Sequence, residues 1–463
     1  MTTDIYSNMA SIFGGGVIFD ASTATVTGCR IVANAANGDG GGLFVTNNST
    51  PMFDDCLIQR NRAEPGDGGG MLITSGADPA FSNTRIFLNT ATGPGGGGGD
   101  GGGAAVRSAS PLFTSCQIVR NNSVRGGGFH LTNAPITIDR CAFSQNDAND
   151  KGGGLFISDS STDLVNCLIH ENNGNFGGGL FLDFGMPSLI NCTVVRNNRE
   201  GVLINNARPE FLNSIFAFNG GVAIYENNSL SDPDSLSYCF FAGNTSADYL
   251  DEGNNPRNGA DAINEMDEAT QNIDGDEPRF VQDGPRAMMG QIDELDFADV
   301  DDIIFLATIT DSDAAFTPGS LAGRLIIPDV GRGEAFIIRD NLETTVIVDG
   351  LPAGTVQEGF TYMILDHTLE PTSDAADRGT TTGAPTTDIQ GFPRPFDLIG
   401  VGVGEGIDIG AHETGQQTLL GFIVDMLLGR IERPSDALEP FDVNQDGTID
   451  IADVVALLGP PEG

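Results

Sequence analysis

Basic residues are scarce in this 463-residue chain. It contains 22 Lys and Arg residues against 64 Asp and Glu residues, which gives a formal net charge of −42, and its only lysine is Lys151. Such a charge repels nucleic acids and anionic membranes and attracts divalent cations. We therefore expect no nucleic-acid partner. The simplest interpretation of the charge is an acidic, well-solvated surface adapted to a salty exterior.

Long apolar runs and a recognisable secretion signal are also missing. No apolar stretch reaches the length of a membrane span, and Met1–Asp4 lacks the basic start and apolar core of a signal peptide. Asn8 followed by Gly14–Gly16 nevertheless fits the end of one sequence repeat and the start of the next. Because a bare first repeat would present unpaired strand edges, we expect further repeats, and with them an export signal, upstream of Met1.

Tryptophan is absent, and the seven cysteines are an odd number, which argues against a fully paired disulfide framework. The cysteines instead mark one position of a repeat, at Cys29, Cys56, Thr84, Cys116, Cys141, Cys167, Cys192, Ser214 and Cys239. A free cysteine packs as a small hydrophobic residue. The regular spacing therefore predicts a column of buried thiols.

Other positions of the repeat recur with the same period as the cysteines, roughly 25 residues, which is within the range of solenoid repeats. An apolar residue stands two positions after each cysteine position and another three positions before it. An asparagine then ends every repeat, at Asn34, Asn61, Asn89, Asn121, Asn146, Asn172, Asn197, Asn219 and Asn244. Stacked repeats would bring these asparagines into a ladder that satisfies polar groups at a bend.

The segments between the columns are short, β-branched and bounded by turn residues, which indicates strands. The repeat is too short for two helices, and we expect two or three strands of 3–5 residues in each coil. The predicted fold class is therefore all-β, a parallel solenoid whose successive coils stack ~4.8 Å apart.

Glycine is abundant at 63 residues, and a run of three follows most of the asparagine positions. Gly152–Gly154 is an example. We expect these runs to form tight bends with positive φ and close backbone approach. The alternative is a phosphate-binding loop, but no Lys-Ser/Thr pair follows and the motif recurs in every coil.

The strand after each glycine run has apolar first and third residues that should point inward, so its second residue should point outward. The outward column comprises Ile18, Phe44, Leu72, Ala105, His130, Phe156, Phe181 and Leu203. If exposed, this partly aromatic stripe would indicate a binding surface. We slightly favour the alternative that a later part of the chain covers it.

The glycine-led strands and the apolar-x-x-Asn element resemble the repeats of polymorphic outer membrane proteins and related bacterial surface proteins, which belong to the right-handed parallel β-helix group that includes pectate-lyase-like enzymes. The resemblance covers residues 8–245, roughly half of the chain. It implies a right-handed β-helix at the cell surface or outside the cell. It does not identify a function, because this fold carries many.

Residues 246–415 form the second predicted region. It starts with an acidic linker and continues with an inserted small β module, whose expected strands are Ile303–Leu306, Arg324–Ile327, Ala335–Ile338 and Thr344–Val348. The stretches 373–379, 388–394 and 407–413 resemble the closing part of many bacterial secreted β-helix proteins. This resemblance implies a C-terminal β-helix cap ending near Glu413.

Residues 416–463 are predicted to be a short helix–calcium loop–helix module. Apolar residues at helical spacing indicate a helix over 418–430. The next segment fits an EF-hand loop, with Gly447 at the sharp turn and the Ca²⁺ ligands Asp442, Asn444, Asp446, Thr448, Asp450 and Asp453. The closing Asp resembles dockerin modules, which implies a possible cohesin-like partner. Dockerins usually carry two such loops, whereas one is visible here.

No catalytic motif stands out. The four histidines occur singly, and we expect each in a surface or turn position. Two hypotheses remain. The first is a surface scaffold whose β-helix face binds polysaccharide or a surface protein. The second is a pectate-lyase-like polysaccharide lyase or glycoside hydrolase carried by the tail. A groove lined with several acids and an arginine would favour the enzyme.

Overall fold

The computed structural model describes residues 3–93, 99–275, 278, 280, 288–300, 304–367, 369, 373, 375–376, 378–390 and 407–412. The chain divides into two compact units. Unit 1 comprises residues 1–278 and 369–463, and unit 2 comprises residues 279–368. The predicted helix over 418–430 and the predicted calcium loop over 442–453 lie outside the described residues.

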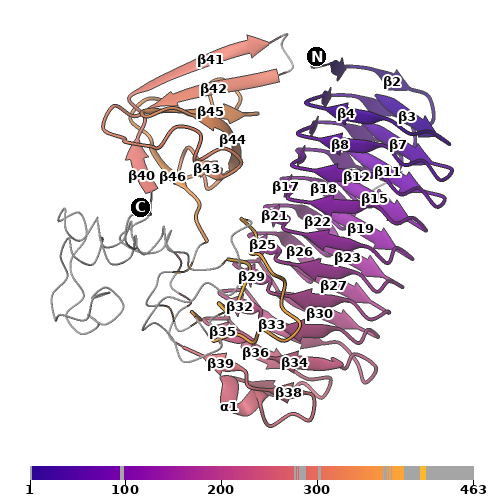
Figure 1. Ribbon diagram of the computed structural model, residues 1–463, viewed down its shortest axis with the longest axis vertical. Helices are drawn as coiled ribbons and strands as arrows, with labels where there is room; N and C mark the ends of the chain where they lie inside the picture. Colours follow the sequence, from indigo (N-terminus) through magenta and orange to yellow (C-terminus); the bar gives the residue numbers. More distant parts are fainter. Residues whose placement is uncertain are drawn as a thin grey trace, which may run out of the picture. The chain divides into compact units, whose positions relative to one another are not determined.

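Unit 1 is a parallel β-helix, in which strands of successive coils stack one above another (Figure 1). Each coil contributes up to four strands, one to each of four sheets that we call A to D. Sheet A contains β1 (Asp4–Tyr6), β5 (Arg30–Val32), β9 (Leu57–Gln59), β13 (Arg85–Phe87), β17 (Gln117–Val119), β21 (Ala142–Ser144), β25 (Leu168–His170), β29 (Thr193–Val195), β32 (Ile215–Ala217), β35 (Phe240–Ala242) and β39 (Ile273–Asp274). Sheet B contains β2 (Met9–Ala10), β6 (Ala35–Ala36), β10 (Arg62–Ala63), β14 (Thr90–Ala91), β18 (Asn122–Arg125), β22 (Asp147–Lys151) and β26 (Asn173–Phe176).

Sheets C and D complete the coils. Sheet C contains β3 (Val17–Asp20), β7 (Leu43–Thr46), β11 (Met71–Thr74), β15 (Ala104–Arg107), β19 (Phe129–Thr132), β23 (Leu155–Ser158), β27 (Leu180–Asp183), β30 (Val202–Asn205), β33 (Val222–Glu226), β36 (Ala247–Leu250) and, antiparallel at its end, β37 (Pro256–Arg257). Sheet D contains β4 (Thr25–Thr27), β8 (Met52–Asp54), β12 (Ala80–Ser82), β16 (Leu112–Thr114), β20 (Thr137–Asp139), β24 (Asp163–Val165), β28 (Ser188–Ile190), β31 (Glu210–Leu212), β34 (Ser235–Ser237) and β38 (Ala269–Thr270).

The core of unit 1 is built from in-register columns, as the sequence predicts. The middle residues of sheet D strands point inward, and the rings of Phe53, Phe81 and Phe113 stack with centroids 4.7 and 5.0 Å apart. All seven cysteines are free, and all except the half-buried Cys29 are buried. The expectation of two or three strands per coil holds for the coils after β26, whereas the earlier coils also carry a strand of sheet B and so have four. The first four strands of sheet B have only two residues each, too few to be recognised by an apolar pattern in the sequence.

The predicted asparagine ladder is confirmed. In every coil step from Asn8 to Asn244, the side-chain amide donates to the Oδ1 of the next asparagine at 3.0–3.1 Å. The same Oδ1 accepts the backbone N–H of the preceding asparagine, as between Asn146 and Asn172 at 3.0 Å. The column therefore uses both ends of each amide at a buried bend.

The glycine runs form the expected bends. Gly152 has φ +66°. Gly153 lies so close to the next coil that a Cβ there would be 2.3 Å from the carbonyl oxygen of Gly178 and 2.5 Å from that of Asn173. The first glycine therefore supplies the turn and the second permits the close approach.

The outward column of sheet C is covered, and in the part of the chain that the structure describes the cover comes from neighbouring turns rather than from a later segment. Phe156 and Phe181 are each 3% exposed and stack on each other at 5.4 Å. The guanidinium of Arg125 and the amine of Lys151, both from sheet B, lie over these two rings at 5.4 and 4.6 Å. The neighbouring turn of the coil thus covers the stripe locally, and only its N-terminal member Ile18 is largely exposed, at 52%.

The stacked hydrogen bonding continues beyond residue 245. Sheet D extends to β38 and sheet A to β39, and the short helix α1 (Ala260–Ile263) lies between β37 and β38 in the chain. Ile263 is fully buried in the solenoid core, and Met266 packs against the same core. Apolar residues from this acidic segment therefore pack against the last coils, and α1 lies beside β39 (Figure 1).

Unit 2 is a seven-stranded sheet, which we call sheet E. Its antiparallel strands are β40 (Met288–Gln291), β41 (Glu294–Val300), β42 (Ile304–Thr310), β43 (Leu325–Ile327), β44 (Phe336–Asn341), β45 (Thr345–Asp349) and β46 (Thr361–Ile364). The four predicted strand stretches correspond to β42, β43, β44 and β45. The acidic stretch that includes β41 was expected to be a linker. It is an edge strand, where acidic residues discourage pairing with other chains.

Candidate functional site

The residues predicted to bind Ca²⁺, Asp442, Asn444, Asp446, Thr448, Asp450 and Asp453, lie outside the described residues. The calcium loop therefore stays a prediction from the sequence. The candidate sites described below belong to unit 1.

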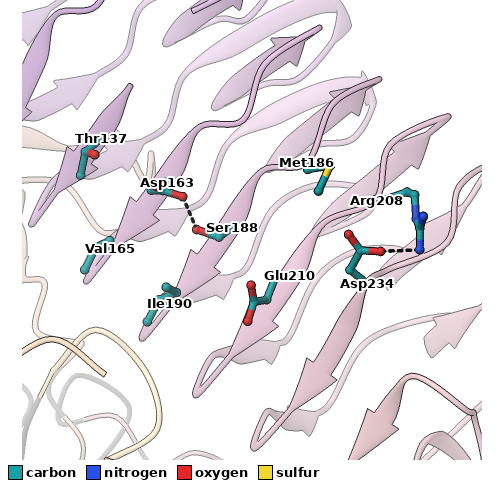
Figure 2. A pocket seen from close by; sticks show the side chains of 9 residues that line it. All are labelled: Thr137, Asp163, Val165, Met186, Ser188, Ile190, Arg208, Glu210 and Asp234. Carbon is teal, nitrogen blue, oxygen red and sulfur yellow. Dashed lines mark hydrogen bonds and ion pairs between the residues drawn. The ribbon is translucent and has the colours of Figure 1, made fainter. Parts of the chain in front are cut away.

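The outer face of sheet D carries a groove of about 310 Å³. Strands of this sheet have a buried middle residue, so their first and third residues point away from the core. The groove crosses the strands from β20 to β31 and reaches the turns beside them (Figure 2). It is lined by Thr137, Asp163, Val165, Met186, Ser188, Ile190, Arg208, Glu210 and Asp234.

Three carboxylates and one guanidinium give the groove its polar character. The hydroxyl of Ser188 donates to Oδ1 of Asp163 at 2.7 Å, and Arg208 pairs with Asp234 at 2.5 Å (Figure 2). Glu210 is exposed and has no hydrogen bond or ion pair with any residue that the structure describes. The groove therefore offers acceptor oxygens, while its cation is already paired.

The apolar part of the groove lies between these charges. Val165 and Ile190 are neighbours in register on β24 and β28, and both are half-buried. Met186, in the turn before β28, is 59% exposed. Branched side chains in register form a flat apolar floor, and acceptor oxygens stand along its edge.

Sequence reasoning missed this groove because its residues come from several coils. Asp163 is the register partner of Ser188, and Ser188 is the register partner of Glu210. Outward positions vary from coil to coil, so they form no column that repetition could reveal. The inward column of Leu164, Leu189 and Phe211 is the signal that could have revealed them. The residue directly before each of these three faces outward and lines the groove.

A C-terminal segment lies along the turns that follow these strands. Asn166 donates its side-chain amide to the carbonyl of Thr387 at 2.8 Å, and Asn213 donates to that of Thr380 at 2.8 Å. The N–H of Thr380 donates back to Oδ1 of Asn213 at 2.9 Å. The described residues 378–390 of the predicted cap region are thus fixed across several coils, beside the third residues of sheet D.

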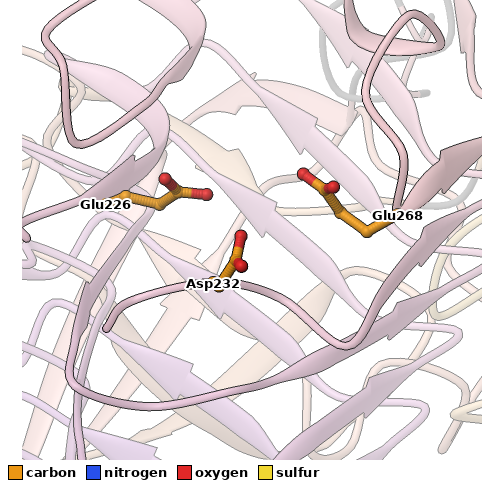
Figure 3. Close-up of side chains that lie close together, drawn as sticks. All are labelled: Glu226, Asp232 and Glu268. Carbon is orange, nitrogen blue, oxygen red and sulfur yellow. The ribbon is translucent and has the colours of Figure 1, made fainter. Parts of the chain in front are cut away.

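A second group of acids lies near the last coils. One carboxylate oxygen from each of Glu226, Asp232 and Glu268 lies within 4.8 Å of the others (Figure 3). Burial raises the pKa of Glu226 to about 8, although its hydrogen bond from Tyr249 acts in the opposite direction. Burial also raises the pKa of Glu268. Carboxylates this close together can share protons, because a like charge nearby disfavours the ionised form of each.

All four histidines are buried, so the expectation of surface positions is wrong, and His130 and His170 lie in strands rather than turns. His367 and His412 lie outside the helices and strands. His130 in β19 is 4% exposed and His170 in β25 is 1% exposed. Burial lowers the pKa of each to about 4, which keeps both rings neutral near pH 7. Neither lines the groove on sheet D.

No helix among the described residues is long and apolar enough to cross a membrane. A family model for the right handed beta helix region matches residues 2–135 and 108–258. Comparisons with curated proteins and with solved structures found no match. The family model therefore supports the β-helix architecture. The role of the groove is inferred from the residues that line it.

Proposed function

Because this family model covers more than half of its residues, the chain belongs to the right-handed β-helix family, and we propose that it is an extracellular or cell-surface scaffold that binds polysaccharide in the groove on sheet D. The observation that carries the proposal is the combination of a flat apolar floor with acceptor oxygens along one exposed sheet face. The location outside the cell rests on the acidic composition and on the resemblance of the repeats to surface proteins.

Sugar chains suit this lining. A pyranose ring has an apolar C–H face, which can lie on Val165 and Ile190, and a rim of hydroxyl donors. Ionised carboxylates only accept hydrogen bonds, so Asp163 and Glu210 match hydroxyl groups. The floor and the acceptors lie on rigid strands, which limits the entropy lost on binding.

A glycan panel tests this proposal. Ile190→Ser removes part of the floor and should weaken glycan binding several-fold, because one buried CH₂ is worth ~0.8 kcal/mol. Leu112→Ser is the matched control, since Leu112 is 45% exposed on the same face but does not line the groove. Equal affinity of both variants and the wild type would exclude the groove as the binding site.

The enzyme alternative remains a second candidate, because the groove combines three acids with an arginine. Glycosidases use paired carboxylates, and lyases need a base beside the sugar. Incubation with neutral and acidic polysaccharides, with and without Ca²⁺, should then release reducing or unsaturated ends. Glu210→Gln should abolish that release while Asp78→Asn, outside the groove, should not. Binding without any released ends would reject the enzyme.

We further propose that residues 442–453 bind Ca²⁺ and attach the protein to a cohesin-like partner. The support is the sequence pattern of oxygen ligands around Gly447. Ca²⁺ should increase helicity in circular dichroism, and Asp442→Ala should abolish the increase. Gln445→Ala is the control, because position 4 of this loop supplies no ligand in the EF-hand pattern. A Ca²⁺ response that survives Asp442→Ala would refute the site.

A further inference from the structure

We infer that the groove on sheet D selects glycans that carry protonated amines, such as chains of glucosamine, over neutral and acidic glycans. This inference rests on the proposed function and names the class of polysaccharide that the groove fits. It follows from the charge, the free acceptors and the register of the lining residues.

The charge of the groove disfavours acidic sugars. Asp163, Glu210 and Asp234 face one cation, Arg208, so the formal charge of the lining is −2, three acids minus one base. Arg208 is held by Asp234 at 2.5 Å, and its side chain is 63% exposed. A uronate carboxylate would therefore meet two uncompensated charges of its own sign and no unpaired cation in the lining.

The acceptors suit an ammonium group better than a hydroxyl group. Glu210 has no partner in the described part of the chain, and Asp163 uses Oδ1 for Ser188. An ammonium has three donors, and its hydrogen bonds to a carboxylate are charge-assisted and about twice as strong as those between neutral groups. Neutral sugars would supply only hydroxyl donors to the same oxygens.

The register places the two carboxylates for one extended ligand. Asp163 and Glu210 belong to one outward column with Ser188 between them, so they are two coil steps apart, roughly 9–10 Å. A glycan lying along the solenoid axis can contact both and cover the floor of Val165 and Ile190. A small cation or a flexible basic peptide would leave that flat apolar floor largely unused.

Calorimetry with three tetrasaccharides tests the inference: a glucosamine tetramer, its N-acetylated counterpart and a tetragalacturonate. Binding is measured at low ionic strength and mildly acidic pH, where the sugar amines are protonated and most carboxylates stay ionised. We expect the glucosamine tetramer to bind about tenfold more tightly than the N-acetylated one. Tetragalacturonate should bind most weakly.

Variants locate the selectivity. Glu210→Gln should reduce the affinity for the glucosamine tetramer about tenfold and that for the N-acetylated tetramer by much less, because the Gln carbonyl still accepts a hydroxyl hydrogen bond but no longer carries the charge. Glu210→Lys should reverse the order of glucosamine and galacturonate tetramers. Asp78→Asn is the control, because it also neutralises an exposed acid beside sheet D, and Asp78 does not line the groove. Circular dichroism checks that each variant is folded.

The outcomes separate the two claims. Equal or tighter binding of the N-acetylated or acidic tetramer, with the loss on Ile190→Ser retained, would overturn the amine selectivity and leave the proposed function intact. Failure of all three tetramers to bind would overturn both. Displacement of the glucosamine tetramer by an equal concentration of a lysine tetrapeptide would show that charge alone is recognised, and would also overturn the selection of a glycan.

Discussion

Tyr249 donates its hydroxyl to the carboxylate of Glu226, and both side chains are buried in the last coils of the solenoid. The backbone N–H of Glu252 donates to the other oxygen of Glu226 at 3.2 Å. Asp232 and Glu268 lie beside this pair. A carboxyl group in these surroundings holds its proton more strongly than in water, because burial penalises its charged form.

The pair predicts a pH-dependent stability. Burial raises the pKa of Glu226 from 4.5 to about 8, so the folded chain binds more protons than the unfolded chain between these values. Its contribution to stability is fully present below pH 4.5 and is lost as the pH rises through about 8. Glu226→Gln should remove this slope, and the variant should exceed the wild type near pH 8 by a few kcal/mol at most.

Urea denaturation at several pH values measures this difference. Glu358→Gln serves as the control, because Glu358 is exposed and is not among the groups that shift the pKa of Glu226. A wild-type slope that persists in Glu226→Gln would show that another group causes it.

The asparagine ladder predicts a large effect from a single amide. Asn172 donates to Oδ1 of Asn197 and to the carbonyl of Phe143, and accepts from the N–H and amide of Asn146. Asn172→Ala leaves these buried partners unsatisfied and should cost about 2–4 kcal/mol in the free energy of unfolding. Asn227→Ala, at an exposed position outside the ladder, should cost less than ~0.5 kcal/mol. Similar denaturation midpoints for the two variants would contradict the role of the ladder.

The close approach at Gly153 predicts intolerance to one methyl group. A Cβ at this residue would meet two carbonyl oxygens within 2.5 Å, so coils must separate. Gly153→Ala should destabilise unit 1 by at least ~1–3 kcal/mol, seen as a lower melting temperature. Gly331→Ala in unit 2 is the comparison, because the nearest atom to its Cβ would be Oδ1 of Asp329 at 3.2 Å. A Gly153→Ala variant with the same melting temperature as the wild type would disprove the packing argument.

The pair of hydrogen bonds between Asn213 and Thr380 predicts where the C-terminal segment is held. Asn213→Ala should speed hydrogen exchange over residues 378–390 by roughly 5–30-fold, because each lost bond is worth ~1 kcal/mol. Asn83→Ala is a matched control. Asn83 occupies the same left-handed turn position with φ 47° against 49° for Asn213, but its amide donates to Asp54. Equal exchange in both variants would mean that other contacts hold the segment.

Repetition explains which parts of the fold could be predicted from the sequence. Asn172, Cys167 and Gly152 each recur in register in other coils, so one residue type reports a constraint that many coils share. The two-residue strands of sheet B have no such signal, and β41 was hidden because Glu294, Asp296 and Asp299 dominate its composition. Strand formation there depends on pairing with β42 rather than on an apolar pattern.

The candidate site could not be predicted for a related reason. Asp163, Ser188 and Glu210 differ in type and lie 22–25 residues apart, and only the stacking of coils makes them neighbours. The buried histidines show a similar effect, because His170 follows the inward Ile169 and is buried on the other side of its strand. Alternation indicates which side a residue faces, but not what covers that side.

The in-register stacking of sheet D has a consequence for how such a protein can change over time. Duplication of one coil would add one more step to the exposed face while keeping the asparagine and glycine contacts on either side, because each coil contacts only its neighbours. The length of ligand that this face accommodates would then depend on the number of coils. The kind of ligand that it prefers would depend on individual outward residues. The length of the binding face and its ligand preference can therefore change independently of each other.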